Sequence, residues 1–268
     1  EHRERLFAGI DRQNFKDLQS ETEVYTRLGL DYIAPELREN RGEIEAAGVG
    51  NLPKLINFPD IRGDLHVHSN WSDGVERIED LATAARSLGY EYIAITDHSK
   101  SLTISGGLSE ERLQAQGKVI DALNAQAPDG FCILKGIEVD ILKNGELDFP
   151  DHVLKELDIV VASVHSNFKL DADQQTERIV EAAKNEHVDI IGHLTGRLLS
   201  RRSGYEIDVD KIIDTCACYH TALEINAYPD RLDIDEHIAR KAKDYGVKVA
   251  INSDAHHRNE LKLMAYGV

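Results

Sequence analysis

The chain is poor in cysteine, in tryptophan and in long apolar runs. Its 268 residues include three cysteines and one tryptophan, and aromatic residues make up 6% of the total. An odd, small number of cysteines in a chain of this size does not supply a disulfide framework, so we expect a reducing compartment, the cytoplasm. No apolar run approaches the about 18 residues of a membrane-spanning helix. The charged first residues, 1–5, do not resemble a signal peptide.

Two of the cysteines, Cys216 and Cys218, form a C-x-C pair that could bind a metal ion. No second cysteine pair supports such a site. Packing in a core or on a helix face is therefore the favoured interpretation for both.

Positive charge is also scarce. Lysine and arginine number 31 against 48 aspartates and glutamates, which gives a net charge of −17. This excludes broad nonspecific adsorption to nucleic acid. It does not exclude an enzyme of nucleic acids, because divalent ions held by carboxylates would restore positive charge locally. A hydrophobic content of 41% is enough for one large globular domain with a real core.

Residues 1–58 differ from the rest of the chain. They are charged, contain Pro35 and Pro53, and lack an alternation of strands and helices. Ser20 is a plausible cap for a short helix that ends near Gly29. We interpret this part as a connector or the tail of a preceding domain. The last residues, 263–268, look like the end of a helix, and we expect the chain to be a fragment of a longer protein.

From about residue 59, apolar runs alternate with helical patterns. Strands are predicted near 61–67, 91–96, 132–139, 158–164, 188–192, 222–226 and 247–252. Helices are predicted at 78–88, 109–126, 173–185, 208–219 and 235–245, and Asn144-Gly145 predicts a hairpin tip. This alternation indicates an α/β fold. We prefer a closed barrel of the TIM type, because its strand ends converge on one mouth.

Residues of metal-ligand type follow most of the predicted strands. The nine candidates are His66, His68, Asp73, His98, Glu138, His165, His193, Asp254 and His256. A single histidine on an apolar strand is more often a packed core residue. Repetition weakens that alternative, because so many buried polar groups would be costly without metal ions or ion pairs. Their number exceeds what one ion needs, and the mixture of imidazole and carboxylate suits Zn, Mn or Fe.

Other catalytic patterns are missing from the sequence. We find no serine-hydrolase elbow, no Walker loop and no G-x-G-x-x-G fingerprint, whereas hydrolysis assisted by two or three metal ions needs no protein nucleophile. Lys100, Arg197 and Arg201 are candidate phosphate-binding residues, and Arg202 is either another or a solvated loop residue. Trp71, Phe168, Tyr205 and Tyr228 could stack on a base or pack. Asp64 and Asp97 could orient a histidine or cap a turn. His2, His152, His187, His220, His237 and His257 are left out of the ligand set.

Three segments carry a family resemblance: Gly63–Gly74, with its His66-Val67-His68 and Ser72-Asp73-Gly74, then Ile95–His98, and then Asn252–His256. Over about residues 59–268 the chain resembles the polymerase and histidinol phosphatase (PHP) domain. The resemblance implies a distorted seven-stranded (β/α) barrel with three divalent ions. It assigns His66, His68, Glu138 and Asp254, the expected catalytic set, to the first ion. Glu138 as a bridge with His165 and His193 would hold the second, and Asp73, His98 and His256 the third.

Further segments resemble the PHP domain of bacterial and archaeal family X DNA polymerases. They are Ser99–Leu102, Gly196–Leu199 and Leu223–Asp233, and residues 23–39 are similar to the end of the polymerase thumb and its linker. This implies a Mn-dependent 3′–5′ exonuclease that processes single-stranded or gapped DNA 3′ ends in repair, beside an upstream polymerase domain, without membrane binding, as a monomer. Two alternatives stay open: a small-molecule phosphatase of the histidinol-phosphatase type, and an inactive domain that positions DNA.

Overall fold

The computed structural model describes residues 17–127 and 130–268. The features noted at residues 1–16, including His2, lie outside this range. The chain divides into two compact units, Glu1–Ile56 and Asn57–Val268, close to the boundary expected near residue 58. Within the described ranges, no helix combines the length and the apolar character that crossing a bilayer requires.

The described part of the first unit consists of short helices. They are α2 (Glu21–Arg27), the 3₁₀ turn η2 (Pro35–Leu37) and α3 (Glu43–Gly48). The Ser20 side chain accepts a hydrogen bond from the backbone N–H of Glu23 and so caps α2, as predicted. The Arg38 guanidinium lies 5.6 Å from the ring centres of both Tyr25 and Tyr32, which ties α2 to the segment that follows η2.

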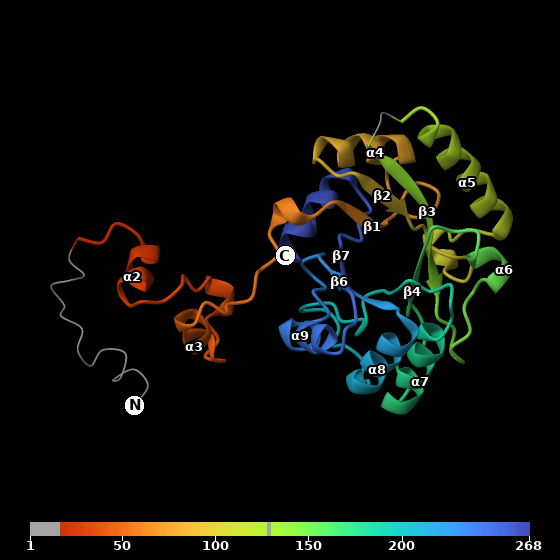
Figure 1. The fold of residues 1–268 in the computed structure, drawn as a ribbon. Helices are drawn as coiled ribbons and strands as arrows, with labels where there is room; N and C mark the ends of the chain where they lie inside the picture. The colour runs from red at the N-terminus through yellow and green to blue at the C-terminus, as the bar shows by residue number, and fades with distance from the viewer. Residues whose placement is uncertain (1–16, 128–129) are drawn as a thin grey trace. The chain divides into compact units, whose positions relative to one another are not determined.

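The second unit is a nearly closed barrel of seven parallel strands (Figure 1). In chain order they are β1 (Gly63–Val67), β2 (Tyr92–Ile95), β3 (Cys132–Asp140), β4 (Ile159–Ser163), β5 (Ile190–Ile191), β6 (Ala222–Asn226) and β7 (Val249–Asn252). Each strand pairs with the next in sequence. All seven predicted strands are present, and the predicted α/β barrel is confirmed.

The barrel closes between β1 and β7 without a full ladder. The backbone N–H of His68 donates to the carbonyl of Ala255 at 2.8 Å, and the N–H of Leu65 donates to Oδ1 of Asn252 at 3.2 Å. These contacts bring the loop after β7 beside the end of β1, so residues almost two hundred positions apart share one rim.

Helices lie outside the strands (Figure 1). They are α4 (Ile78–Ser87), α5 (Glu110–Asn124), α6 (Asp151–Leu154), α7 (Ala172–Ala183), α8 (Val209–Tyr219) and α9 (Glu236–Asp244). Four of them begin at a side chain that accepts a hydrogen bond from the first turn, namely Ser109, Asp171, Asp208 and Asp235. Such caps satisfy N–H groups that have no partner inside the helix.

Apolar faces of these helices fill the space against the strands. In α4, Ile78, Leu81 and Ala85 are fully buried at three- and four-residue spacing, as predicted. Leu88, the last residue of the predicted pattern, lies just after α4 and is exposed. A larger cluster lies under α7 and α8, where Ile179 and Ile212 have no exposed surface. This packing positions the strands, and with them the loops at their carboxyl ends.

Some predicted details were incomplete. The helices α3 and α6 were not foreseen, because four to six residues are too few to show a period. The chain has the expected helix end, since η5 (Arg258–Tyr266) finishes before Gly267, but its 3₁₀ form was not foreseen. The 141–149 segment is the expected hairpin, with an antiparallel bridge between Ile141 and Leu147 and Gly145 at a φ of 87°.

Candidate metal centre

The candidate ligands meet at the carboxyl ends of the strands. His66 and Glu138 lie within β1 and β3, and His68 follows β1 directly. The loops after β1, β2, β4, β5 and β7 supply the others: Asp73, His98, His165, His193, Asp254 and His256. Asp73 is exposed, His165 and His256 are half-buried, and the remaining six are buried. The tertiary structure therefore gathers all nine at one mouth.

Glu138 lies at the centre of this cluster, with five histidines around its carboxylate. Oε1 lies 2.8 Å from Nε2 of His193, 3.2 Å from Nε2 of His165 and 3.4 Å from Nε2 of His66, while Oε2 lies 2.8 Å from Nδ1 of His98 and 3.6 Å from Nε2 of His68. Burial opposes ionisation of Glu138, but the histidines hold the pKa of its carboxyl well below the usual range. The carboxylate is thus anionic and requires positive charge nearby.

Three overlapping groups of side chains have ligand atoms within 4.8 Å of one another. They are His66, His68 and Glu138; His98, Glu138 and His165; and His68, Asp73, His98 and His256. Glu138 belongs to two groups, as a bridging ligand would. Asp254 adjoins the first group, since its Oδ1 lies 3.1 Å from Nε2 of His68. His193 adjoins the second through Glu138.

The donor atoms fit divalent ions. Buried side-chain atoms that make no well-aligned hydrogen bond are concentrated here: Nε2 of His66, both ring nitrogens of His68, Nδ1 of His98, Oε2 of Glu138 and Nδ1 of His193. Two of them, Nδ1 of His98 and Oε2 of Glu138, lie 2.8 Å apart. Unpartnered buried polar atoms are rare and costly. Burial together with the neighbouring His256 and His98 lowers the pKa of His68 to about 3, so its ring is neutral, the form that coordinates metal.

Several histidines are oriented from behind by an acceptor on Nδ1. Oε1 of Glu224 lies 2.7 Å from Nδ1 of His66, a carboxylate oxygen of Asp140 contacts Nδ1 of His165, and the Asp254 carbonyl lies 2.9 Å from Nδ1 of His256. Each contact leaves Nε2 facing the cluster. Acceptors of this kind fix the ring orientation and raise the basicity of a ligand histidine.

Glu224 and Asp140 were missed by the sequence reasoning. Glu224 belongs to β6, the strand without a candidate ligand, and its second oxygen accepts from the backbone N–H of His193 at 2.8 Å. A glutamate inside an apolar strand was the available signal. Asp140 ends β3 on the same face as Glu138, two positions on, and this alternation could have identified it.

Asp64 and Asp97 fasten backbone and hydroxyl groups rather than imidazoles. Asp64 accepts from the N–H groups of His66 and Ser253. Asp97 accepts hydrogen bonds from Ser69, Ser72 and Gln116. The bonds from Ser69 and Ser72 hold the loop that carries Asp73. The turn-capping alternative describes both residues better than ring orientation does.

Two candidate ligands adopt left-handed backbone conformations. The φ angles of His193 and Asp254 are 24° and 54°, which non-glycine residues seldom adopt and which cost about 1–3 kcal/mol each. Asp254 is held there by Asn226, whose Nδ2 donates to Oδ2 at 2.9 Å, and by Arg231, whose Nε lies 3.1 Å from the same oxygen. Oδ1 is left to face His68.

The predicted phosphate-binding residues differ in how they are engaged. Lys100 lies 3.6 Å from Glu110 and over the Phe149 ring. Arg197 donates to the carbonyls of Arg231 and Leu232, so it joins the β5 and β6 loops. Arg201 is exposed and pairs with Asp230 at 3.1 Å. Their contact with a substrate stays a prediction.

The other aromatic and cysteine predictions have mixed outcomes. Trp71 packs against both apolar clusters, and Phe168 stacks with Tyr205 at 6.2 Å. Cys216 is buried and Cys218 exposed, as ordinary helix residues would be. Among the described residues, the groups able to hold a metal include none of His152, His187, His220, His237 and His257.

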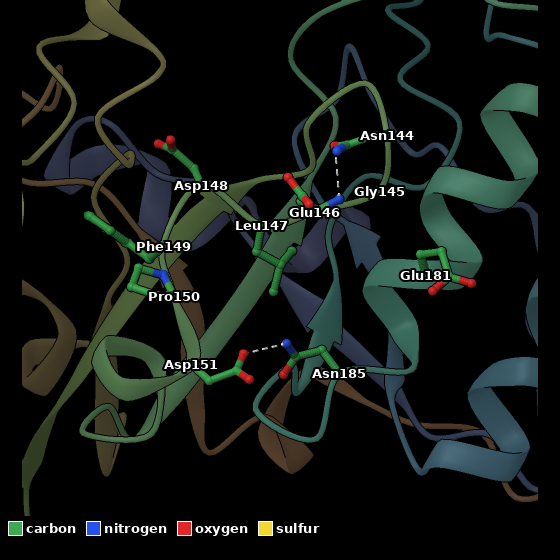
Figure 2. Close-up of a pocket in the computed structure, with 10 residues that line it drawn as sticks. All are labelled: Asn144, Gly145, Glu146, Leu147, Asp148, Phe149, Pro150, Asp151, Glu181 and Asn185. Atoms are coloured by element: carbon green, nitrogen blue, oxygen red, sulfur yellow. Dashed lines mark hydrogen bonds between the residues drawn. The ribbon is translucent and has the colours of Figure 1, made fainter.

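A separate cavity of about 590 Å³ lies between the 144–150 hairpin and the end of α7 (Figure 2). Asp151 accepts from Asn185 at 2.9 Å across one side of it. Its charged lining consists of the carboxylates of Glu146, Asp148, Asp151 and Glu181, without an imidazole. Anionic groups repel phosphate esters, so we place the chemistry at the histidine-rich mouth instead.

The sequence of this chain matches known proteins. The PHP domain family matches residues 64–228. "DNA polymerase/3'-5' exonuclease PolX" from Bacillus subtilis is 47% identical over 97% of this chain, which spans only 45% of that protein. A "Probable phosphatase" from Thermoanaerobacter sp. is 35% identical over 72% of this chain and 78% of that protein.

Solved structures agree on the fold. HisK from Listeria monocytogenes has a TM-score of 0.60 at 14% identity, covering 74% of this chain and 97% of its own. Histidinol phosphate phosphatase from Lactococcus lactis, complexed with zinc, L-histidinol and phosphate, has a TM-score of 0.56 at 20% identity, covering 76% and 92%. PHP domains are metal-dependent phosphoesterases, and the ligand cluster described above suits that chemistry. This chain belongs to the PHP domain family and is similar to the PHP domain of PolX proteins.

Proposed function

We propose that this chain is a metal-dependent phosphodiesterase that removes nucleotides from DNA 3′ ends, as a 3′–5′ exonuclease domain of a PolX-type protein acting in repair. The observation that carries the proposal is the convergence of unpartnered histidine and carboxylate atoms around Glu138. The 47% identity to PolX over 97% of this chain supports DNA as the substrate.

The proposed ligand set is the nine-residue cluster, with Glu138 between two ions. Zn, Mn or Fe fits the donors, and Mn is the ion we expect to support activity. Bound divalent ions would supply charge stabilisation for the phosphoryl oxygens and activation of water. Glu138 and Asp254 hold negative charge at fixed positions, and the neutral ring of His68 supplies a nitrogen lone pair.

Chain residues beside the ligands would handle the substrate. Arg231 adds positive charge next to Asp254, and 18% of its side-chain surface is exposed. Lys100, Arg197 and Arg201 remain proposed contacts to the DNA backbone. In this proposal residues 1–58 are the end of a polymerase thumb and the interdomain linker, and an upstream polymerase domain is the partner in the same protein. A monomer in the cytoplasm stays our expectation.

The test is incubation of the chain with 5′-labelled single-stranded DNA and Mn. We expect stepwise shortening that stops with a chelator and is lost in His68→Ala, because that ring borders two of the three ligand groups. His152→Ala is the matched control, since His152 is exposed on α6. Intact DNA together with rapid hydrolysis of histidinol phosphate would support the phosphatase alternative. Inactivity on both, with retained DNA binding, would support the positioning alternative.

A further inference from the structure

The loops after β4 and β5 carry a layered stack of side chains next to the ligand cluster. The Arg202 guanidinium carbon lies 4.2 Å from the centre of the Phe168 ring. Phe168 in turn stacks with Tyr205 at 6.2 Å between ring centres, with an interplanar angle of 27°. Phe168 follows His165 by three residues, and Arg202 follows His193 by nine. The stack therefore joins the two loops that bring these histidines to Glu138.

The stack is held firmly in place. The Tyr205 hydroxyl donates to the carbonyl of Leu194 at 2.7 Å. Gly196 has a φ of 60°, and a side chain there would collide with the Tyr205 ring at 2.6 Å. The carbonyl of this glycine accepts from Nε of Arg202 at 2.9 Å. These contacts fix the plane of the guanidinium before any ligand binds, which reduces the entropy lost on binding.

Arg202 differs from Arg197 and Arg201 because its terminal guanidinium nitrogens are available to a ligand. Arg197 donates from Nε and one terminal nitrogen to backbone carbonyls, and Arg201 pairs with Asp230. Arg202 is half-buried, and among the described residues its two terminal nitrogens have no hydrogen-bond or ion-pair partner. A guanidinium with an open fork matches two oxygens of a phosphate.

We propose that Arg202 binds the backbone phosphate next to the scissile phosphodiester, on the 5′ side, and thereby selects polynucleotides over isolated phosphate esters. The proposal rests on the proposed exonuclease function and deepens it. A 3′-terminal phosphodiester at the ligand cluster has its strand continuing in the 5′ direction only. Arg202 lies on the loops that bound the cluster, so it can meet the next phosphate of that strand.

The test compares wild type and Arg202→Gln on two substrates with Mn. We expect KM for a 5′-labelled oligonucleotide to rise roughly 10- to 100-fold, with a salt dependence of log KM that is shallower by about 0.7. Hydrolysis of bis(p-nitrophenyl) phosphate, which has no second phosphate, should be unchanged. Arg240→Gln, exposed on α9, is the matched control and should change neither.

A modified oligonucleotide tests which backbone phosphate Arg202 binds. A neutral methylphosphonate at the linkage next to the scissile one should weaken the wild type to the level of Arg202→Gln and should not weaken the variant further. An equal penalty in both proteins overturns the proposal, and so does an equal loss on bis(p-nitrophenyl) phosphate. A larger effect of removing the terminal base than of the methylphosphonate would indicate base stacking instead.

The same oligonucleotides keep this test independent of the exonuclease proposal. If the wild type degrades no DNA, the exonuclease proposal fails. The Arg202 proposal is then decided by fluorescence anisotropy of labelled oligonucleotides without hydrolysis. The proposal is supported if Arg202→Gln binds the unmodified oligonucleotide at least 10-fold more weakly than wild type does, and if the two proteins bind the methylphosphonate oligonucleotide equally. Equal affinity of wild type and variant overturns it.

Discussion

Glu224 connects two candidate ligands: Oε1 lies 2.7 Å from Nδ1 of His66, and Oε2 accepts from the backbone N–H of His193 at 2.8 Å. Both oxygens are buried, and Asn252 donates to Oε1 at 2.9 Å. One carboxylate thus orients a ring from β1 and the backbone after β5. Glu224, which is not itself a proposed ligand, therefore controls the geometry of two proposed ligands, His66 and His193.

Replacing Glu224 with glutamine should weaken metal binding without removing a ligand. The amide cannot carry the negative charge that favours His66 with its proton on Nδ1 and its lone pair on Nε2. We expect metal affinity to fall about 10- to 100-fold, measured by competition with a coloured chelator. Glu156→Gln, exposed after α6, is the control. Unchanged affinity in Glu224→Gln would contradict the positioning role.

Glu138 and Asp73 should differ in how many ions they affect. Glu138 belongs to two ligand groups and Asp73 to one. Bound Mn or Zn per chain, measured by elemental analysis after dialysis, should fall further in Glu138→Gln than in Asp73→Asn. Circular dichroism should show that both variants remain folded. Equal losses in the two variants would rule out a bridging role for Glu138.

Asp233 should make the protein less stable as the pH rises. Burial, together with the negative charge of Glu224, raises the pKa of Asp233 to about 7, and its Oδ1 has no partner. The unfolded carboxyl titrates near 3.9. Between these values the folded protein binds the extra proton, so the free energy of unfolding falls as pH rises from about 4 to 7.

Asp233→Asn should remove that loss. With a chelator present, urea unfolding should show the variant about 1–3 kcal/mol more stable than wild type at pH 8, with a smaller difference at pH 5. Asp214→Asn, exposed on α8, should show no such trend. A difference between Asp233→Asn and wild type that is constant with pH would disprove the assignment.

Arg178 should be important for stability although it is charged and buried. It is 1% exposed and donates from α7 to the carbonyls of Ile141, Leu142 and Ser166. Arg178→Met would leave these carbonyls without their donor, at a cost of about 2–4 kcal/mol in the free energy of unfolding. Urea unfolding measures it, with Arg86→Met on the exposed face of α4 as control. A loss below about 0.5 kcal/mol, typical of surface sites, would show that water replaces the arginine.

Much of the fold was predictable because its signals are local. Alternating apolar runs and helical periods predicted all seven strands, and the capping residue Ser20 marked the start of α2. The short α6 and the 3₁₀ form of η5 were not predictable, since neither is long enough or regular enough to show a period. The proposed ligands were recognisable by type, as histidines and acids after strands.

The sequence by itself determined the fold class and the residue types that gather at the mouth, because period and composition act over a few neighbouring residues. Its ordered motifs, such as His66-Val67-His68, carried the family resemblance. Only the tertiary structure decided which partners complete the site. Glu224, Asp140 and Arg231 lie next to ligands from other strands, at separations of 25 to 158 residues for the first two. The same holds for Arg202, whose open guanidinium depends on a ring from the preceding loop. Such contacts arise from the pairing of successive strands and, for Glu224 and His66, from barrel closure. Both place distant strand ends side by side and leave no periodic signal in the chain.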